Sequence, residues 1–334
     1  MYPVNQSIAH SDDVHHQATL LRAWDQEYTQ LRAGDFTGSV GTLATPGIKL
    51  FSEQMNRAVF QTGALPEGRL AFGLPLRASG RCRICGEDGT ADDVLVFSGR
   101  SGFEFVSPDL FTFVGIEIDP ASSEDPVFVG MVALLERVIS SDRRSIRIDP
   151  AKAAKLGRLL TAMLSDDGPG VRLEEWPDQA AAFNRGLVGW LLDMLQPSEP
   201  DGGPVTPRHW QAISAIRQMV KTSPCCPISV AELTVELGLS RRTLQNACQE
   251  IVGMSPVQYL RALRLSEARR MMQRATSVTE VATQFGFWHL GYFSRDYQMM
   301  FGELPSATLR RWRAPTGDAV RDTRPRRSQR PYPS

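Results

Sequence analysis

The sequence contains few of the residues from which metal and redox centres are built. Five of its 334 residues are histidine and five are cysteine, and no histidine lies between His16 and His209. A metal site with several histidine ligands is therefore excluded from that long segment. A phosphate-binding loop, a dinucleotide-binding fingerprint and a hydrolase nucleophile elbow are also missing. We expect no catalytic residues, no metal and no cofactor, and hence no enzyme.

Long hydrophobic runs are absent as well. No stretch approaches the ~18 uninterrupted apolar residues of a transmembrane helix. The N-terminal residues lack the basic start and the apolar run of a secretory signal. Hydrophobic residues make up 42% of the chain and charged residues 22%, as in soluble globular proteins. These features predict a cytoplasmic protein with no membrane partner.

The chain as a whole has no net charge, but its two halves carry opposite charges. The chain has 37 Lys and Arg against 37 Asp and Glu, for a formal net charge of +0. From Pro204 to Ser334 we count 19 basic and 9 acidic residues, a charge of +10, so residues 1–203 carry −10. Such an asymmetry between the two halves of a chain is a hint of nucleic-acid binding.

Proline and glycine mark a boundary where the charge changes sign. Residues 196–207 contain four prolines and two glycines, a composition that supports neither a helix nor a strand. We interpret this segment as a linker between a domain at 1–195 and a second domain at 206–313. The Arg- and Pro-rich tail at 314–334 is predicted to be disordered. The expected fold class is α+β in two domains.

The first domain is predicted to combine antiparallel strands with helices. Between about 37 and 118, short apolar runs are interrupted by Gly, Pro and Asp, a spacing typical of an antiparallel sandwich or barrel. Residues from about 125 to 195 are predicted to be helical, and Trp24–Leu31 is a further predicted helix. The clearest strand candidates are Ile48–Phe51, Arg69–Leu74, Asp93–Phe97, Gly102–Val106 and Phe111–Ile118.

The basic half contains an internal repeat. Ser229 with Glu232, and Ser277 with Glu280, both have the S-x-x-E form of a capping box, which starts a helix. Apolar residues follow in both copies at a constant offset of 48, up to a glycine. A glycine that closes one short helix and leads directly into the next is typical of a helix-turn-helix. The second domain is therefore predicted to be all-α with two helix-turn-helix units.

The second helix of each unit is the predicted DNA-reading element. These helices are expected at about Arg241–Ile251 and Leu290–Phe301. A single exposed Arg is usually only a solvated residue. Several side chains able to bond base edges within two turns instead favour base recognition, because Arg pairs with guanine and Asn or Gln with adenine. Asp296 is expected on the same exposed face. The candidate DNA-binding residues are Ser240, Arg241, Arg242, Gln245, Asn246, His289, Tyr292, Ser294 and Arg295.

One long helix is predicted between the two units. Ser255 is its expected N-cap and Pro256 its first residue, where a missing N–H has no consequence. Its basic residues are expected to meet phosphates or solvent, and they are Arg261, Arg264, Arg269, Arg270 and Arg274.

Three motifs make the basic half recognisable. They are Leu239-Ser-Arg-Arg-Thr-Leu-Gln245, Gly253-Met-Ser-Pro-Val-Gln-Tyr-Leu260, and the run from Gly286-Phe to Phe301-Gly-Glu-Leu-Pro-Ser306. With them, residues 206–313 resemble the DNA-binding domain of the AraC/XylS family of bacterial transcription regulators. The resemblance implies seven helices and places Arg242, Gln245, Asn246 and Arg295 at positions that contact DNA. Leu290 and Gly291 depart from the polar residues usual there, which favours a phosphate contact for Arg295.

The resemblance also implies a cupin-like N-terminal barrel that binds a small effector and dimerises. It further implies contact with RNA polymerase in an activator, and activation is favoured over repression. An effector pocket is mostly apolar with a few polar groups, and its candidate lining residues are Phe51, Glu53, Phe72 and Arg77. Gly286-Phe-Trp-His-Leu-Gly291 and Pro305-Ser-Ala-Thr-Leu309 are similar to motifs in regulators of ethanolamine operons, which makes ethanolamine one candidate effector.

The expected function is that of a sequence-specific DNA-binding transcription regulator controlled by a small molecule through the 196–207 linker. One alternative is a thiol-redox-responsive regulator that uses Cys82 and Cys85. A lone C-x-x-C has no second pair at zinc-site spacing, and a cytosolic setting opposes a structural disulfide, so incidental thiols are favoured. A ligand-independent DNA-binding protein is a second alternative, although it would not need an acidic domain of about 200 residues.

Overall fold

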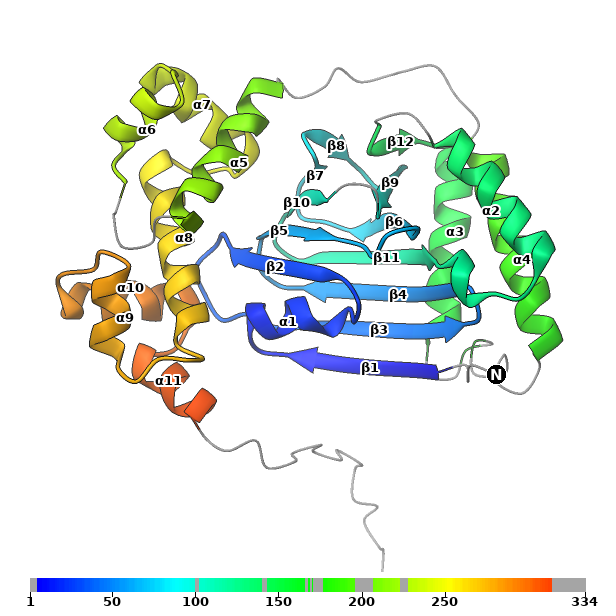
Figure 1. The fold of residues 1–334 in the computed structure, drawn as a ribbon, viewed down its shortest axis with the longest axis horizontal. Coiled ribbons are helices and arrows are strands. Elements are labelled where there is room, and N and C mark those ends of the chain that lie inside the picture. Colours follow the sequence, from blue (N-terminus) through cyan, green and yellow to red (C-terminus); the bar gives the residue numbers. More distant parts are fainter. Residues whose placement is uncertain are drawn as a thin grey trace, which may run out of the picture.

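The computed structural model describes residues 5–99, 102–139, 143–165, 168, 170, 177–195, 207–222 and 228–313 (Figure 1). Within these residues, strands, four α-helices and a short 3-10 helix form an N-terminal region, and further helices form a C-terminal region beside it. Residues 196–206 of the predicted linker and the predicted tail at 314–334 lie outside the described residues.

The N-terminal region is built on two antiparallel sheets. Its strands are β1 (Asn5–Ser11), β2 (Asp25–Gln30), β3 (Gly38–Thr45), β4 (Ile48–Met55), β5 (Val59–Ala64), β6 (Leu70–Arg77), β7 (Cys82–Ile84), β8 (Glu87–Gly89), β9 (Asp93–Ser98), β10 (Phe103–Ser107), β11 (Phe111–Ile118) and β12 (Ser145–Arg147). The larger sheet has the order β1-β3-β4-β11-β6-β9-β12 and the smaller one β2-β5-β10-β7-β8. The predicted antiparallel barrel with appended helices is confirmed at this level, and the five strand candidates are β4, β6, β9, β10 and β11.

The start of the sheets differs from the prediction. The helix predicted at Trp24–Leu31 is wrong, because residues 25–30 form β2 and pair along their whole length with β5. Tyr and Thr favour strands. Pairing with β5 also satisfies the backbone hydrogen-bonding groups of these residues, whereas a short isolated helix is only marginally stable. Helix α1 (Val14–Leu20) lies earlier, where the Asp13 side chain accepts from the His15 and His16 amides. Strands β1 and β2 thus precede the predicted start at about 37, and β12 lies inside the segment predicted to be helical.

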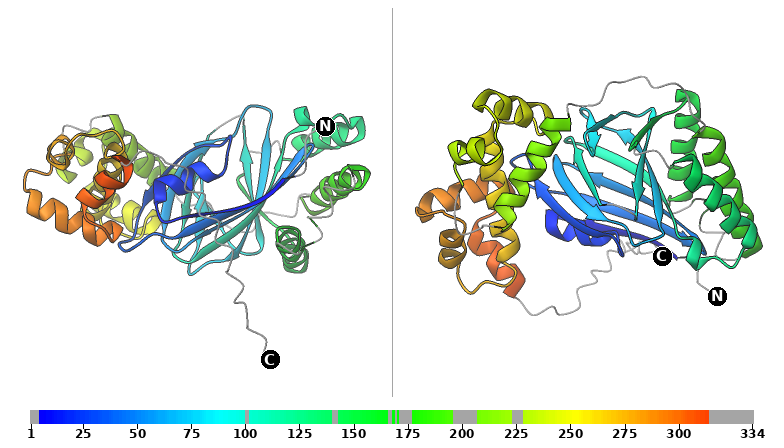
Figure 2. Two further views of the ribbon diagram at one scale, coloured as in Figure 1. Left: turned by 90° about the horizontal axis from the view of Figure 1, so that it is seen from below. Right: turned by 45° about the horizontal axis from the view of Figure 1, so that its top comes forward.

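Strand alternation produces two separate cores in the N-terminal region. On β4, Phe51 points between the two sheets, into an aromatic cluster where Phe97 and Phe103 have ring centroids 5.0 Å apart. Its neighbour Leu50 points to the opposite face of the larger sheet. Three helices cover that face, α2 (Pro126–Val138), α3 (Pro150–Met163) and α4 (Pro177–Met194), after a short 3-10 helix η1 (Pro120–Ser122). Figure 2 shows these helices on the side of the sheets away from the C-terminal region.

The C-terminal region contains seven helices within its described residues. They are α5 (Pro207–Thr222), α6 (Val230–Glu236), α7 (Arg241–Ile251), α8 (Pro256–Met271), α9 (Val278–Gln284), α10 (Leu290–Phe301) and α11 (Pro305–Arg313). The predicted bounds of the two DNA-reading helices are confirmed by α7 and α10. Gly238 and Gly286 have φ of 59° and 76°, which a larger residue would adopt only with strain. The chain therefore forms two helix-turn-helix units, α6–α7 and α9–α10, joined by α8.

The two regions share a core. Phe60 on β5 stacks on Trp210 of α5 with ring centroids 6.1 Å apart, and both side chains belong to a buried cluster that continues into the first helix-turn-helix unit. Around it, Glu27 on β2 accepts from the Lys221 and Arg270 side chains at 2.7 Å each. The opposite charges of the two halves therefore meet at this contact.

Candidate nucleic-acid interface and effector pocket

Helix α7 is held so that its first two turns face solvent. The Ser240 hydroxyl accepts from the Thr243 amide at 3.1 Å and so serves as the N-cap of the helix. Leu244 and Cys248 are fully buried and fix the rotation of the helix about its axis. The exposed residues are Arg241, Arg242, Gln245 and Asn246. No described residue bonds the side chains of these four, so their donors and acceptors are available to a ligand.

Helix α10 presents a more apolar surface. Tyr292 is 62% exposed, and the Arg295 guanidinium lies 5.6 Å from the centre of its ring. The His289 ring is 5.9 Å from the same ring, while Ser294 is half-buried. Trp288, just before α10, is 69% exposed and is not among the predicted DNA-binding residues. The sequence did contain a signal for this exposure. The apolar positions of the repeat already account for the core, so a tryptophan that follows the turn outside those positions is expected at the surface.

Asp296 does not lie on the exposed face of α10, contrary to the prediction. Its side chain is 5% exposed and pairs with Arg261 of α8. Position 296 lies next to Tyr297 on the face of α10 that packs on the domain core, so the carboxylate points inward. The pairing removes a negative charge from the surface that would meet phosphates.

The prediction that the arginines of α8 face phosphates or solvent is wrong for most of them. Arg269 is 3% exposed and pairs with Asp13 at 2.6 Å and Glu303 at 2.8 Å. Arg270 pairs with Glu27 across the contact between the regions, and Arg264 donates to a backbone carbonyl. These side chains hold α8 against the rest of the molecule.

The four predicted effector residues do not come together. Phe51 lies in the aromatic cluster between the sheets, whereas Phe72 points to the opposite face and packs in the core beneath α2, α3 and α4. Phe51 pairs with Gly115 of β11 and Phe72 with the next residue, Ile116, and adjacent strand positions face opposite sides of a sheet. Glu53 is buried, and Arg77 is exposed at the end of β6. Among the four, only Arg77 borders the cavity described below.

Glu53 is held in a buried hydrogen-bonded group. Its Oε1 accepts from Gln17 Nε2 and from the Tyr28 hydroxyl, each at 3.0 Å. Burial raises the pKa of Glu53 to about 7, although both hydrogen bonds oppose the rise. The carboxyl group therefore titrates near neutral pH.

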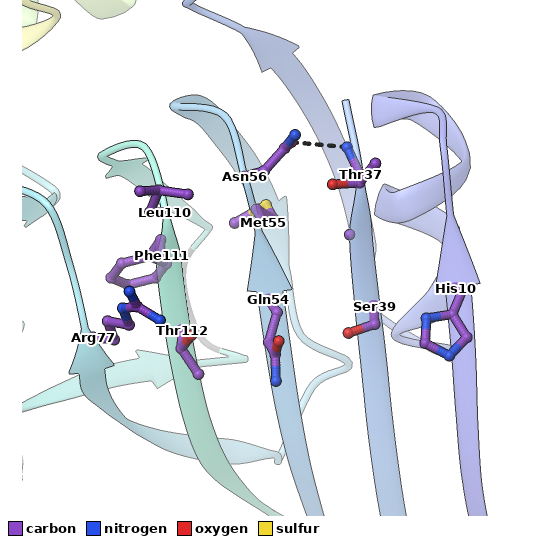
Figure 3. A pocket seen from close by; sticks show the side chains of 11 residues that line it. His10, Thr37, Ser39, Gln54, Met55, Asn56, Arg77, Leu110, Phe111 and Thr112 are labelled. Atoms are coloured by element: carbon purple, nitrogen blue, oxygen red, sulfur yellow. Dashed lines mark hydrogen bonds between the residues drawn. The ribbon is translucent and has the colours of Figure 1, made fainter. Parts of the chain in front are cut away.

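A cavity of about 350 Å³ opens on the larger sheet at the strand ends nearest the C-terminal region (Figure 3). Its floor is a row of polar side chains on five adjacent strands, in which each residue is the cross-strand partner of the next. The row is His10, Ser39, Gln54, Thr112 and Arg77. The remaining lining residues are Thr37, Gly38, Met55, Asn56, Leu110 and Phe111. Arg77 also borders a second hollow of about 390 Å³.

The two cysteines of the C-x-x-C motif are free thiols that favour the protonated form. Cys82 is 1% exposed, and burial raises its pKa to about 12. Burial also raises the pKa of Cys85. A thiol needs its thiolate form to react, so neither residue is activated. Across the described ranges, no three His, Cys, Asp or Glu side chains gather where a metal could bind, and no helix is long and apolar enough to cross a membrane.

Comparison with known proteins defines the class. Residues 233–311 match a family model described as a helix-turn-helix domain. The "Probable thc operon regulatory protein" of Rhodococcus erythropolis is 38% identical over 88 residues, which cover 25% of this chain and 26% of that protein. The chain thus spans about a quarter of the length of that relative.

Two further relatives extend the match. The "XylDLEGF operon transcriptional activator 2" of Pseudomonas putida is 35% identical over 136 residues, covering 39% of this chain and 84% of that protein. A crystal structure of a probable AraC family transcriptional regulator from Rhodopseudomonas palustris is 35% identical, with a TM-score of 0.29, and covers 31% of this chain and 98% of that one. The protein is a helix-turn-helix protein. It belongs to the AraC/XylS family of transcriptional regulators.

Proposed function

We propose that the protein is a sequence-specific DNA-binding transcription regulator whose N-terminal region responds to a small molecule. The observation that carries this proposal is the exposed start of α7, where Arg241, Arg242, Gln245 and Asn246 have no partner among the described residues. Arg forms paired hydrogen bonds with guanine, and Gln and Asn do so with adenine, so a helix with this surface suits the major groove. The Ser240 cap positions the helix and leaves the next side chains free to contact base edges.

The second unit fits a different kind of contact. Tyr292, Leu290 and Trp288 offer apolar surface, which suits thymine methyl groups and sugars rather than base hydrogen bonds. Arg295, above the Tyr292 ring, suits a phosphate. Helix α8 has 16 residues, for a length of about 24 Å. This rigid connector supports the use of both units in successive major-groove segments, which lie ~34 Å apart on one face of B-DNA.

Double-stranded promoter DNA is the proposed macromolecular partner, and the bacterial cytoplasm is where such DNA is found. The relative from Pseudomonas putida is named an activator, which supports activation for this chain. Family membership is the support for contact with RNA polymerase and for a homodimer. No enzymatic reaction is proposed. The protonated state favoured at Cys82 and Cys85 weighs against the redox alternative.

Selection of binding sites from a random duplex DNA library by the full-length protein tests the proposal. The expected result is a defined motif that is lost when Arg241, Arg242, Gln245 and Asn246 are all replaced by Ala. A matched control replaces Arg158, an exposed residue of α3, with Ala and should recover the same motif. Enrichment of no motif, or an unchanged motif from the α7 variant, would overturn the proposal.

A further inference from the structure

We propose that the cavity crossed by the row from His10 to Arg77 is the effector site, and that it binds a small organic anion through Arg77. The proposal rests on the proposed function and names the site and the chemical class of its ligand. The aromatic cluster fills the space between the two sheets. The row lies instead on the opposite face of the larger sheet, as its cross-strand pairs require.

The charge of the lining points to an anion. Of the 11 lining residues, none is Asp or Glu, whereas His10 and Arg77 are basic. Arg77 is exposed and forms no ion pair with any described residue. Its planar guanidinium binds a carboxylate or a phosphate through two parallel hydrogen bonds. The same lining offers no counter-charge to a cation such as ethanolamine.

The rest of the row suits the body of such a ligand. Strands lie about 4.8 Å apart, so His10 and Arg77 are about 19 Å apart at the backbone, and a single anionic group cannot meet both. Gln54, Ser39 and Thr112 lie between them and provide hydrogen-bonding groups (Figure 3). We therefore assign the anionic group to Arg77 and the polar body to the middle of the row.

Leu110 forms a strained apolar edge beside Arg77. It has a φ of 51°, in the left-handed region that non-glycine residues seldom adopt, and its side chain is 56% exposed. Strain of this kind gathers at ligand-binding and switching positions. An exposed leucine next to an unpaired guanidinium fits a ligand with a short apolar part beside its acid group.

A single loop joins this cavity to the second recognition helix. Asn56 lines the cavity; its Oδ1 accepts from the Thr37 amide at 2.8 Å, drawn as a dashed line in Figure 3, and its Nδ2 donates to the Asp35 carbonyl at 3.0 Å. One residue earlier, the Gly34 amide donates to the carbonyl of Met300 in α10 at 3.1 Å. A ligand that bonds Asn56 therefore acts on the loop that holds the end of α10.

Gln30 strengthens the same connection from outside the cavity. Its Nε2 donates to the Gly34 carbonyl at 2.8 Å and to the Met300 carbonyl at 2.7 Å. Gly302, the C-cap of α10, approaches this loop so closely that a Cβ there would lie 1.4 Å from Asp35 Oδ1. The contact is tight enough for a shift of the loop to move α10 relative to α7. If DNA prefers one position of α10 relative to α7, the two binding events are linked. The ligand then changes DNA affinity, and DNA changes ligand affinity, by the same factor.

Titration of the full-length protein tests the ligand site. The anionic probes are succinate, butyrate and glycerol 3-phosphate, and the controls are ethanolamine and glycerol. We expect at least one anion to bind saturably. Binding of butyrate or succinate would identify a carboxylate ligand, and binding of glycerol 3-phosphate alone would identify a phosphate ligand. Arg77→Gln should weaken that binding about 10-fold or more, as expected for loss of a charged hydrogen-bonding partner. Arg158→Gln removes the same charge from α3 and should leave the affinity unchanged. Binding of no anion, equal effects of the two substitutions, or equal binding of ethanolamine would each overturn the site.

Binding of the selected DNA site with and without the anion tests the connection. The ligand should change DNA affinity in the wild type. Gln30→Ala and Asn56→Ser should abolish that change, and Gln30→Ala should also keep wild-type ligand affinity because Gln30 is not in the cavity lining. A ligand that binds without changing DNA affinity would overturn the connection alone. A protein that binds the anion but selects no DNA motif would overturn the proposed function and leave the anion site standing.

Discussion

Asp13 and Arg269 form a buried ion pair between positions 256 residues apart in the chain. Asp13 Oδ2 accepts from Arg269 Nε at 2.9 Å and Nη2 at 2.6 Å, and each side chain is 3% exposed. The other carboxylate oxygen accepts from the His15 and His16 amides and starts α1. Burial raises the pKa of Asp13, but the Arg269 guanidinium and the other contacts outweigh it and hold the pKa below its ordinary value. One carboxylate therefore fixes both the first helix of the N-terminal region and the helix that joins the two helix-turn-helix units.

Replacing Arg269 with Met should lower the free energy of unfolding by about 3–5 kcal/mol, because it leaves the Asp13 charge buried without its partner. Arg270→Met is the matched control, since its ion pair with Glu27 is about one-third exposed on each side and is worth at most about 1 kcal/mol. Urea denaturation of both variants measures the difference. Equal losses of unfolding free energy in the two variants would show that the buried ion pair contributes no more to stability than the partly exposed one.

Replacing Arg242 with Ala should weaken binding to the selected DNA site by about 1–3 kcal/mol and relax the preference at one base pair. Affinity for random DNA should change much less, because only base readout is removed. Electrophoretic mobility shifts with both DNAs measure the two effects, with Arg158→Ala as the control. An equal loss on both DNAs would assign Arg242 to a phosphate.

DNA affinity should fall as salt rises from ~50 to 200 mM, because arginine contacts with phosphates release counterions. Most arginines of α8 are engaged within the protein, so the dependence should come from α7 and α10. Arg295→Ala should therefore reduce the slope of log affinity against log salt by about 1. A slope unchanged by this substitution would remove the phosphate contact assigned to Arg295.

Glu53 should make folding stability depend on pH near neutrality. Its pKa is raised from an ordinary 4.5 to about 7, so its contribution is present below pH 4.5 and is lost as pH rises through 7. Glu53→Gln keeps an acceptor for Gln17 and Tyr28 and cannot ionise. It should raise the free energy of unfolding by up to about 3 kcal/mol near pH 8 and have little effect near pH 4.

The comparison of wild type and variant must be made at each pH, because His15 acts in the opposite sense. Burial lowers the pKa of His15 to about 4 from 6.5, so its contribution is present above pH 6.5 and is lost as pH falls towards 4. Urea denaturation of both proteins at each pH cancels this common effect. An effect of Glu53→Gln that does not change with pH would show that Glu53 is not the titrating group.

Replacing Cys82 and Cys85 with Ser should leave both DNA affinity and the response to the anion unchanged under oxidising and reducing conditions. Burial raises the pKa of both thiols, so neither reacts readily as a thiolate. Mobility shifts with and without a mild oxidant provide the measurement. A response to oxidant in the wild type that is lost in the double variant would restore the redox alternative.

The local signals in the sequence were sufficient for much of the fold. The predicted bounds of α7 and α10 agree with the structure, because the signals that set them act within one or two helical turns. These are the Ser240 cap and the buried Leu244 and Cys248 in α7, and the turn glycine Gly286 and the buried Phe293 and Tyr297 in α10. Trp24–Leu31 was predicted wrongly for the opposite reason. Residues 25–30 form a strand because β5 lies beside them, and their partners, residues 59–64, are 29 to 39 positions further along the chain.

The site residues divide in the same way. Exposure at the start of α7 followed from helical periodicity alone, and the sequence by itself determined which side chains that helix offers. No local pattern placed His10 beside Ser39, or joined Asn56 to the end of α10, since these relations depend on strand register and on the contact between the two regions. The arginines of α8 illustrate the limit most clearly. Their number and spacing were visible in the sequence. That Arg269 and Arg270 meet Asp13 and Glu27 instead of phosphates was decided by tertiary structure, because the partner of a charge depends on which distant segment folds beside it.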